Sequence, residues 1–368
     1  MKKWQDILKG SITSASTLQE YLHAMPQADP GQSGTGIHSL PPIDITSISR
    51  IIATYPMRIN PYYLQLIKKI GDPLWKQAIP DNAELLDPVC MEDPLGEENL
   101  SPTPNLVHKY PDRVLFLVSN QCAMYCRFCT RKRKVGTEKM VISEETITAG
   151  LDYIRRHPEV REVLLSGGDP LLLTDSKIDD ILHNLRAIPS VKVIRIGTRA
   201  PCTLPMRVTP ELVAILKKYH PLYINTHFNH PAEITPESSA ACNLLADAGI
   251  PLGCQTVLLK GVNDTPEVMR ELMLKLLEIR VKPYYLFQTD LTRGTNHFRT
   301  STATGIRIMR SLIGHISGLA IPTFALDGPG GKGKIPLTPD YILSRGDNLV
   351  FQNFRGEICT YPESGDGI

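Results

Sequence analysis

The sequence lacks an apolar run long enough to cross a membrane, and its first residues lead into a polar amphipathic stretch instead of a signal-peptide core. It carries almost no net charge, with 40 Lys and Arg against 38 Asp and Glu. This balance argues against a nucleic-acid-binding surface and against an acidic tail. Eight cysteines in 368 residues are too few for a disulfide framework. We therefore predict a cytoplasmic, reducing setting, with neither membrane nor nucleic acid as a partner.

A second C-x2-C pair is also lacking. The isolated cysteines are Cys90, Cys202, Cys242, Cys254 and Cys359. The other three, Cys122, Cys126 and Cys129, form the triplet C-x3-C-x2-C. Structural zinc takes four ligands, often as two cysteine pairs, so a zinc knuckle would need a distant histidine and stays an alternative. Three thiolates instead suit an iron–sulfur cube whose fourth iron has no protein ligand.

The first part of the chain is predicted to be helical. Apolar residues recur at helical spacing over Trp4–His23, and helical character resumes over Ile43–Ile70, broken by prolines. The Pro-, Gly- and Ser-rich stretch Met25–Pro42 between them is predicted to be a linker. Residues 86–111 are polar and proline-rich, which predicts an extended crossing segment.

From Arg113 onward, short apolar runs alternate with helical stretches. The predicted strands are Arg113–Ser119, Glu162–Ser166, Val191–Gly197, Leu222–His227, Pro251–Leu258 and Lys282–Gln288. The predicted helices are Ser143–His157, Lys177–Ala187, Pro210–Tyr219, Pro236–Ala248 and Pro266–Ile279, followed by Ser301–Ile316. Such repeats predict parallel strands with right-handed crossovers.

We expect an α/β protein with a partial (β/α)6 TIM-like barrel, because six units fall short of the eight in a closed barrel. A strand at Ile321–Leu326, a glycine-rich loop and a final hairpin at Leu349–Tyr361 are expected to follow. The predicted segments are residues 1–105 (helical region and crossing segment), 106–316 (barrel) and 317–368 (C-terminal extension).

Polar motifs follow several predicted strands, where parallel barrels carry their functional loops. The cysteine triplet follows the first strand, and Ser166–Asp169 follows the second. Gly167 and Gly168 would let the backbone approach a ligand closely, although Gly-Gly-Asp is by itself a common turn. His227 ends the fourth strand, where a hydrogen-bonded structural histidine and a zinc ligand are the competing interpretations.

The segment Asp327–Lys334 reads Asp-Gly-Pro-Gly-Gly-Lys-Gly-Lys. Its glycines expose backbone N–H groups suited to a phosphate, but the spacing is not that of a Walker A loop. A lysine beside a phosphate cradle is typical of a pyridoxal phosphate (PLP) site. A flexible basic loop is the alternative.

These motifs resemble those of two protein families, the second of which is part of the first. The cysteine spacing, with an aromatic residue at Phe128, resembles the radical S-adenosylmethionine (SAM) enzymes, in which the open iron binds SAM. The chain as a whole resembles the lysine 2,3-aminomutase family, which also uses PLP. The matching segments are Glu92–Leu95, His108–Arg113, Met124–Arg131, Leu165–Asp169, Asn225–Pro231, Gln255–Asp264, Pro283–Tyr285, His297–Thr300 and Asp327–Lys334.

The resemblance implies a role for each matching residue. Cys122, Cys126 and Cys129 would ligate a [4Fe-4S] cluster, while Gly167, Gly168, Asp169, His227 and Gln255 would line SAM. PLP would be bound covalently by Lys334, with Arg113 and Lys109 at its phosphate and Tyr110 near its ring. Lys332 is a weaker rival, because the family usually has glycine there. Arg131 would pair with the substrate carboxylate, and Asp290 with Asp327 would hold the substrate ε-ammonium.

The implied reaction is the interconversion of L-lysine and β-lysine by 2,3-amino migration. Arginine, glutamate or a lysine side chain of a protein are alternative substrates. An electron donor such as flavodoxin or ferredoxin and a homo-oligomer are expected partners. Well-known family members continue into a cysteine-rich tail that binds zinc between subunits. Because this chain ends at Ile368, no such zinc is expected.

Overall fold

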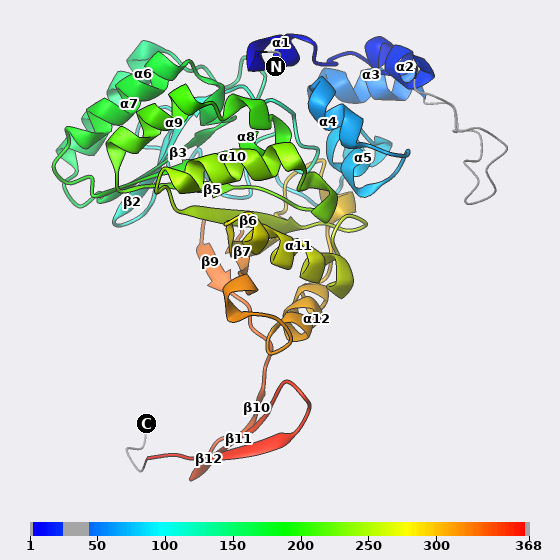
Figure 1. The fold of residues 1–368 in the computed structure, drawn as a ribbon, viewed down its shortest axis with the longest axis vertical. Coiled ribbons are helices and arrows are strands. Elements are labelled where there is room, and N and C mark those ends of the chain that lie inside the picture. Colours follow the sequence, from blue (N-terminus) through cyan, green and yellow to red (C-terminus); the bar gives the residue numbers. More distant parts are fainter. Residues whose placement is uncertain (1–2, 25–43, 365–368) are drawn as a thin grey trace.

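The computed structural model describes residues 3–24 and 44–364. Its centre is a nine-stranded sheet in the order β1 to β9, curled with helices on its outer side (Figure 1). The strands are β1 (Leu106–Tyr110), β2 (Arg113–Ser119), β3 (Glu162–Gly167), β4 (Val193–Gly197), β5 (Leu222–Thr226), β6 (Leu252–Leu258), β7 (Lys282–Gln288), β8 (Thr323–Gly328) and β9 (Gly333–Pro336). The predicted linker Met25–Pro42 lies outside the described residues.

The helices follow the predicted alternation closely. They are α1 (Trp4–Lys9), α2 (Ala15–Ala24), α3 (Ile45–Thr54), α4 (Pro61–Leu66), α5 (Pro73–Ala78), α6 (Glu144–Arg156), α7 (Asp175–Arg186), α8 (Ala200–Thr203), α9 (Pro210–Leu216), α10 (Pro236–Asp247), α11 (Pro266–Glu278) and α12 (Thr302–Leu312). Three of them start at the same local signal, since Thr209, Thr235 and Thr265 each cap a helix whose first residue is proline. Within the described ranges, no helix is both long and apolar enough to span a bilayer.

The partial α/β barrel is confirmed. Strands β2 to β8 run parallel, so β8 continues the six predicted strands as a further parallel neighbour of β7. The end of the predicted extended crossing segment and the end of the predicted glycine-rich loop are strands: β1 pairs antiparallel with β2, and β9 pairs antiparallel with β8. Within the described residues these two edge strands do not pair with each other, which leaves the barrel open.

Burial alternates along the barrel strands because successive side chains point to opposite faces. On β3, Val163 and Leu165 are buried in the main apolar core with Leu151 and Ile154 of α6. The alternate side chain of Ser166 is only half-buried, on the barrel interior. The buried face of β3 is therefore apolar, while its other face, with Glu162, Leu164 and Ser166, is half-buried.

The N-terminal helices contact the cysteine loop directly. Ile59 forms isolated backbone bridges with both Ile12 and Met124. Asn60 Nδ2 donates to the carbonyl of Ala123, 3.1 Å away. The division of the chain at residues 105 and 316 stays a prediction.

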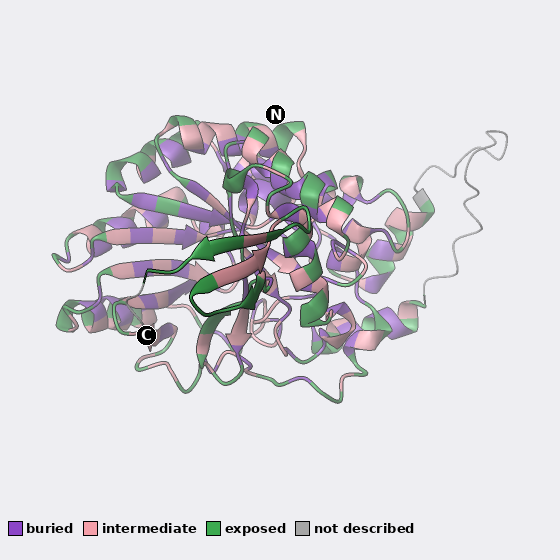
Figure 2. Cartoon of the chain, turned by 90° about the horizontal axis from the view of Figure 1, so that it is seen from below, coloured by how far each residue is buried: buried purple, intermediate pink, exposed green. Residues whose placement is uncertain are grey.

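The predicted final hairpin is confirmed and forms part of a second, three-stranded sheet. Its strands are β10 (Ile342–Ser344), β11 (Asn348–Gln352) and β12 (Ile358–Pro362). This sheet projects away from the barrel (Figure 1) and is largely exposed or half-buried (Figure 2). Ile358 and Tyr361 are 70% and 62% exposed, which is unusual for such large apolar side chains.

Candidate active site

The cysteine loop begins directly after β2. Cys122, Cys126 and Cys129 are half-buried and not in disulfides. Burial is the main reason why the pKa of Cys122 lies well above its usual range and that of Cys129 is raised to about 11. Metal ligation requires thiolates, so a bound metal would have to displace the protons that burial holds on these thiols.

Among the described residues, no three His, Cys, Asp or Glu side chains converge so that they could hold a single metal ion. The three cysteines therefore lack the arrangement of a zinc site. A cubane has a different requirement, because each cysteine binds a separate iron.

Arg199 is a largely buried partner of the cysteine loop. Its Nη1 donates to Cys126 Sγ at 2.7 Å, while its Nη2 binds Gln77 and Glu233 at 2.6 and 2.7 Å. Hydrogen bonds to cluster sulfurs are one means of setting a reduction potential. Arg199 is not among the predicted site residues, although its place just after β4 could have indicated it.

The Ser166–Asp169 turn packs on the cysteine loop. A Cβ on Gly168 would lie 2.4 Å from the carbonyl oxygen of Gln121, and one on Gly167 would lie 2.2 Å from that of Ser119. Gly167 also has φ +124°, which only glycine adopts readily. The glycines therefore allow two loops to approach, in addition to any role toward a ligand.

The carboxylate of Asp169 is engaged within the protein. It accepts hydrogen bonds from Thr198 Oγ1 at 2.7 Å and from the backbone N–H of Arg199 at 2.9 Å. Burial raises its pKa, although these hydrogen bonds oppose the shift. Asp169 thus ties the ends of β3 and β4 together.

His227 lies beside the cysteine loop. Its ring centroid is 5.5 Å from that of Phe128, and its Nε2 is 3.0 Å from Asn229 Oδ1. Burial, and then the charge of Arg199, lower its pKa to about 3, so the imidazole is neutral at neutral pH. Gln255 is half-buried on β6, two residues before Val257, which packs against the cluster containing Phe128.

Charged side chains gather where β1 meets the β8–β9 hairpin. Asp327 lies opposite Lys334 in the β8–β9 register, and its carboxylate is 3.2 Å from Lys334 Nζ and 3.6 Å from Lys109 Nζ. Tyr110 Oη accepts from the backbone N–H of Lys334 at 3.2 Å, and the Arg113 guanidinium lies 4.1 Å from the Tyr110 ring. The structure therefore brings these five predicted residues together.

Lys332 differs from Lys334 in its surroundings. Both lysines are exposed, but Lys334 Nζ lies 5.2 Å from the ring of Phe287 on β7 and 3.2 Å from the Asp327 carboxylate. This placement favours Lys334 as the cofactor lysine, although the assignment stays a prediction.

Asp290 follows β7 and faces the same cluster. Its pKa is raised to about 7, mainly by burial and then by the negative charge of Asp327, while Lys334 and Lys109 oppose the shift. A carboxylate with so high a pKa is poorly compensated within the protein. The Asp290–Asp327 pair therefore favours binding of a further cation.

Arg131 is already paired with a carboxylate in this structure. Its Nε is 3.0 and 2.9 Å from the two carboxylate oxygens of Glu97, and its Nη2 is 2.6 Å from one of them. Nη1 makes only longer contacts, at 3.5 Å from both Ser166 Oγ and the Gly167 carbonyl oxygen, so it is the least engaged nitrogen of the guanidinium. Glu97 orients the guanidinium, and Arg131 as the carboxylate ligand stays a prediction.

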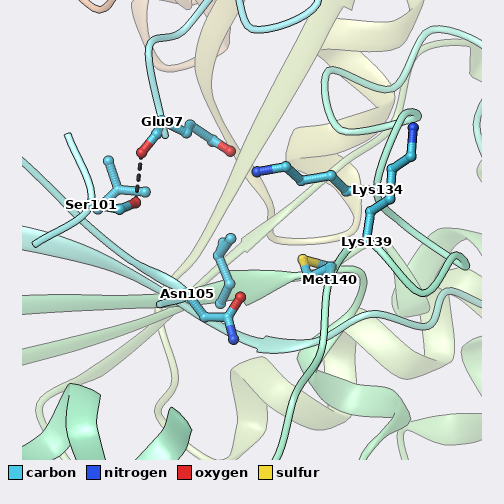
Figure 3. A pocket seen from close by; sticks show the side chains of 8 residues that line it. Glu97, Ser101, Asn105, Lys134, Lys139 and Met140 are labelled. Carbon is cyan, nitrogen blue, oxygen red and sulfur yellow. Dashed lines mark hydrogen bonds between the residues drawn. The ribbon is translucent and has the colours of Figure 1, made fainter. Parts of the chain in front are cut away.

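A small cavity lies beside Glu97 (Figure 3). It is lined by Glu97, Ser101, Asn105, Val107, Leu117, Lys134, Lys139 and Met140. Its volume of about 50 Å³ accommodates water but not an amino acid. The cavity is therefore not the substrate site.

Comparison with known proteins first identifies the class. A model of the Radical SAM superfamily matches residues 116–273, which hold the cysteine loop, the glycine turn and His227. This part of the chain therefore matches the Radical SAM superfamily, whose members use a [4Fe-4S] cluster and SAM.

The family is more specific. A model described as lysine-2,3-aminomutase matches residues 309–368. The chain is 48% identical over 98% of its length to an L-lysine 2,3-aminomutase of Acetoanaerobium sticklandii and covers 84% of that protein. It is 52% identical over 86% of its length to that of Clostridium subterminale, covering 77% of it. A glutamate 2,3-aminomutase of Clostridioides difficile is 47% identical over 84% of this chain, which covers 74% of that protein. The chain belongs to the lysine 2,3-aminomutase family, which uses PLP as well.

Proposed function

We propose that this protein interconverts L-lysine and β-lysine by 2,3-amino migration. The observation that carries the substrate is the carboxylate pair Asp290 and Asp327, since the pKa of Asp290 is raised to about 7 by burial and then by the negative charge of Asp327. An ammonium group between the two carboxylates would relieve their repulsion. The relatives named L-lysine 2,3-aminomutase support the same substrate.

The residues present fit the three groups that the family uses. Cys122, Cys126 and Cys129 would hold the cluster. The Lys334 side chain would hold PLP, with Lys109, Tyr110 and Arg113 around it. Gly167, Gly168, Asp169, His227 and Gln255 would line SAM. Together these groups supply a radical initiator and an electron sink for the migrating nitrogen.

The protein's own side chains would orient the substrate between those groups. Asp290 and Asp327 would fix the distal ammonium, and Nη1 of Arg131, the least engaged nitrogen of its guanidinium, would bind the carboxylate. His227 would stay neutral at working pH because of its lowered pKa, so it can accept or donate a hydrogen bond without adding charge.

The carboxylate pair also discriminates among other amino acids. Glutamate would place a third carboxylate beside Asp290 and Asp327, which disfavours it by charge repulsion. Arginine keeps a cationic tip and is the closer competitor. A lysine within a protein would leave Arg131, which is largely buried, without a free carboxylate to bind.

We also propose a reducing cytoplasmic setting, a small electron-transfer protein such as flavodoxin or ferredoxin as electron donor, and a homo-oligomer. The eight cysteines are all free, which fits a reducing compartment. The exposed apolar side chains of the β10–β12 sheet support an oligomer, because such surfaces are commonly covered in assemblies.

The test is a substrate panel. Anaerobically purified protein, reconstituted with iron, sulfide and PLP, would be incubated with SAM, dithionite and either lysine, arginine or glutamate. We expect β-lysine as the main product, and none without SAM. Faster conversion of arginine or glutamate would refute the substrate, whereas modification of a protein lysine alone would refute a free amino acid.

A further inference from the structure

Glu84 is a fully buried carboxylate that binds two cations of the cysteine loop. It ends a short 3-10 helix (Asn82–Glu84) in the N-terminal region and is 1% exposed. Its oxygens lie 2.9 Å from Arg127 Nε and 2.8 Å from Lys132 Nζ. Arg127 stands between the second and third cysteines, and Lys132 follows the third by three residues.

Lys132 uses all of its donors inside the protein. Besides Glu84, its Nζ donates to the carbonyl of Arg127 at 3.0 Å and to that of Gly294 at 2.9 Å. It also lies 4.3 Å from the Tyr55 ring. Because an ammonium has three N–H donors, Lys132 has none left for a ligand. Its contribution must come through the segments that it connects.

Gly294 belongs to the loop that carries Asp290. Its N–H donates to Asp87 Oδ2 at 2.8 Å, and its carbonyl accepts from Lys132, so both backbone polar groups of Gly294 are hydrogen-bonded. Gly294 also packs closely against Tyr55 and Glu84, since a Cβ there would lie 2.9 Å from the Tyr55 ring and 3.1 Å from the Glu84 carbonyl oxygen. The loop has little room to shift relative to Glu84.

We propose that Glu84 and Lys132 are positioning residues that hold the cysteine loop in register with the Asp290 loop. The proposal rests on the proposed function, in which the cysteine loop carries the radical initiator and Asp290 fixes the substrate. Transfer of a hydrogen atom between two bound molecules needs near-contact geometry, and a misplacement of about 1 Å can cost about 100-fold in rate. The Glu84–Lys132–Gly294 connection sets this spacing.

A role limited to stability makes a different prediction. Removing one partner of a buried ion pair destabilises a protein. If the pair were merely stabilising, its loss would lower the amount of active enzyme but not the fraction of SAM cleavages that lead to product. A positioning pair would allow SAM cleavage to continue while fewer cleavages give product. The product-to-5′-deoxyadenosine ratio therefore separates the two roles.

The experiment compares Lys132→Met, Lys132→Arg and Lys134→Met with wild type. Lys134 is the matched control, because it lies on the same loop but pairs with the exposed Glu98. For Lys132→Met we expect normal iron content and a ratio of product to deoxyadenosine lowered roughly 10- to 100-fold. We expect partial rescue by Lys132→Arg and no change in Lys134→Met. An unchanged ratio in Lys132→Met would overturn the proposal.

Hydrogen exchange supplies a readout independent of turnover. In cofactor-free protein, Lys132→Met should speed backbone exchange over residues 289–296 as well as over the cysteine loop, whereas faster exchange in the cysteine loop alone would refute the connection.

A second variant serves if Lys132→Met fails to fold. Asp87→Ala removes the carboxylate that binds the N–H of Gly294, and it should also lower the ratio of product to deoxyadenosine. An unchanged ratio in Asp87→Ala would count against the proposal. Wild-type protein inactive on every amino acid would refute the proposed function, while the exchange result would still decide the connection.

Discussion

Replacing Asp290 by asparagine should weaken lysine binding strongly. The change keeps the shape of the side chain but leaves Asp327 as the single carboxylate at the substrate ammonium. Truncating one partner of a buried charge pair costs about 2–5 kcal/mol. At about 1.4 kcal/mol for each tenfold, kcat/KM for lysine should fall by roughly 30-fold to several thousandfold. PLP content and cluster content should stay at the wild-type level.

The pH profile gives this prediction its sharpest form. The pKa of Asp290 is raised to about 7, so the carboxyl is neutral at lower pH and cannot attract the ammonium. In wild type, kcat/KM for lysine should therefore rise about tenfold per pH unit below pH 7 and level off above it. Asp290→Asn should remove that step. Asp327→Asn should move it to lower pH, because the charge of Asp327 raises the pKa of Asp290.

The same shift predicts an effect on stability. The folded state holds the Asp290 proton up to about pH 7, whereas the unfolded chain releases it near pH 3.8. Stability is therefore lost as pH rises between these values, by up to about 4 kcal/mol. Asp290→Asn should raise the free energy of unfolding of cofactor-free protein increasingly from pH 4 to pH 7, and by a constant amount above. A wild-type profile without a step, together with unchanged stability in the variant, would refute the role of Asp290.

The remaining predictions concern the cofactor sites. Cys126→Ser should abolish cluster loading while leaving the circular dichroism spectrum intact, and continued deoxyadenosine production would contradict the ligand assignment. Borohydride reduction of the PLP-loaded protein should label Lys334 in peptide mapping, and a label on Lys332 would show the lysine assignment to be wrong. Gly168→Ala should destabilise the protein by about 1–3 kcal/mol in denaturant unfolding, because the new methyl group overlaps a carbonyl of the cysteine loop. Gly318→Ala, where nothing lies within 4 Å, is its control and should show little change.

The barrel was predictable because its signals are local. Each strand is a short apolar run, and the helices begin at capping residues such as Thr235 and Thr265. The strands β1 and β9 were missed, since proline-rich and glycine-rich composition disfavours strands. Pairing with the free edges of β2 and β8 outweighs that preference.

Within the site, the motifs could be found from spacing, but their partners could not. The pairs Glu84–Lys132 and Glu97–Arg131 join residues 48 and 34 positions apart. No periodicity links such positions, because they meet only after the N-terminal segments have packed against the barrel. Arg199 could be predicted only in part: the sequence shows that it follows a strand, but not that it binds the sulfur of Cys126.

The open seam of the barrel has a consequence for ligand exchange. Within the described residues no backbone ladder closes the seam: Lys109 of β1 pairs with Asp327 of β8, and the Tyr110 hydroxyl of β1 accepts from the backbone N–H of Lys334 on β9. The side chains that would bind cofactor and substrate therefore also connect the two edges of the barrel. Ligands bound there would add contacts across the seam, and their release would require those contacts to break.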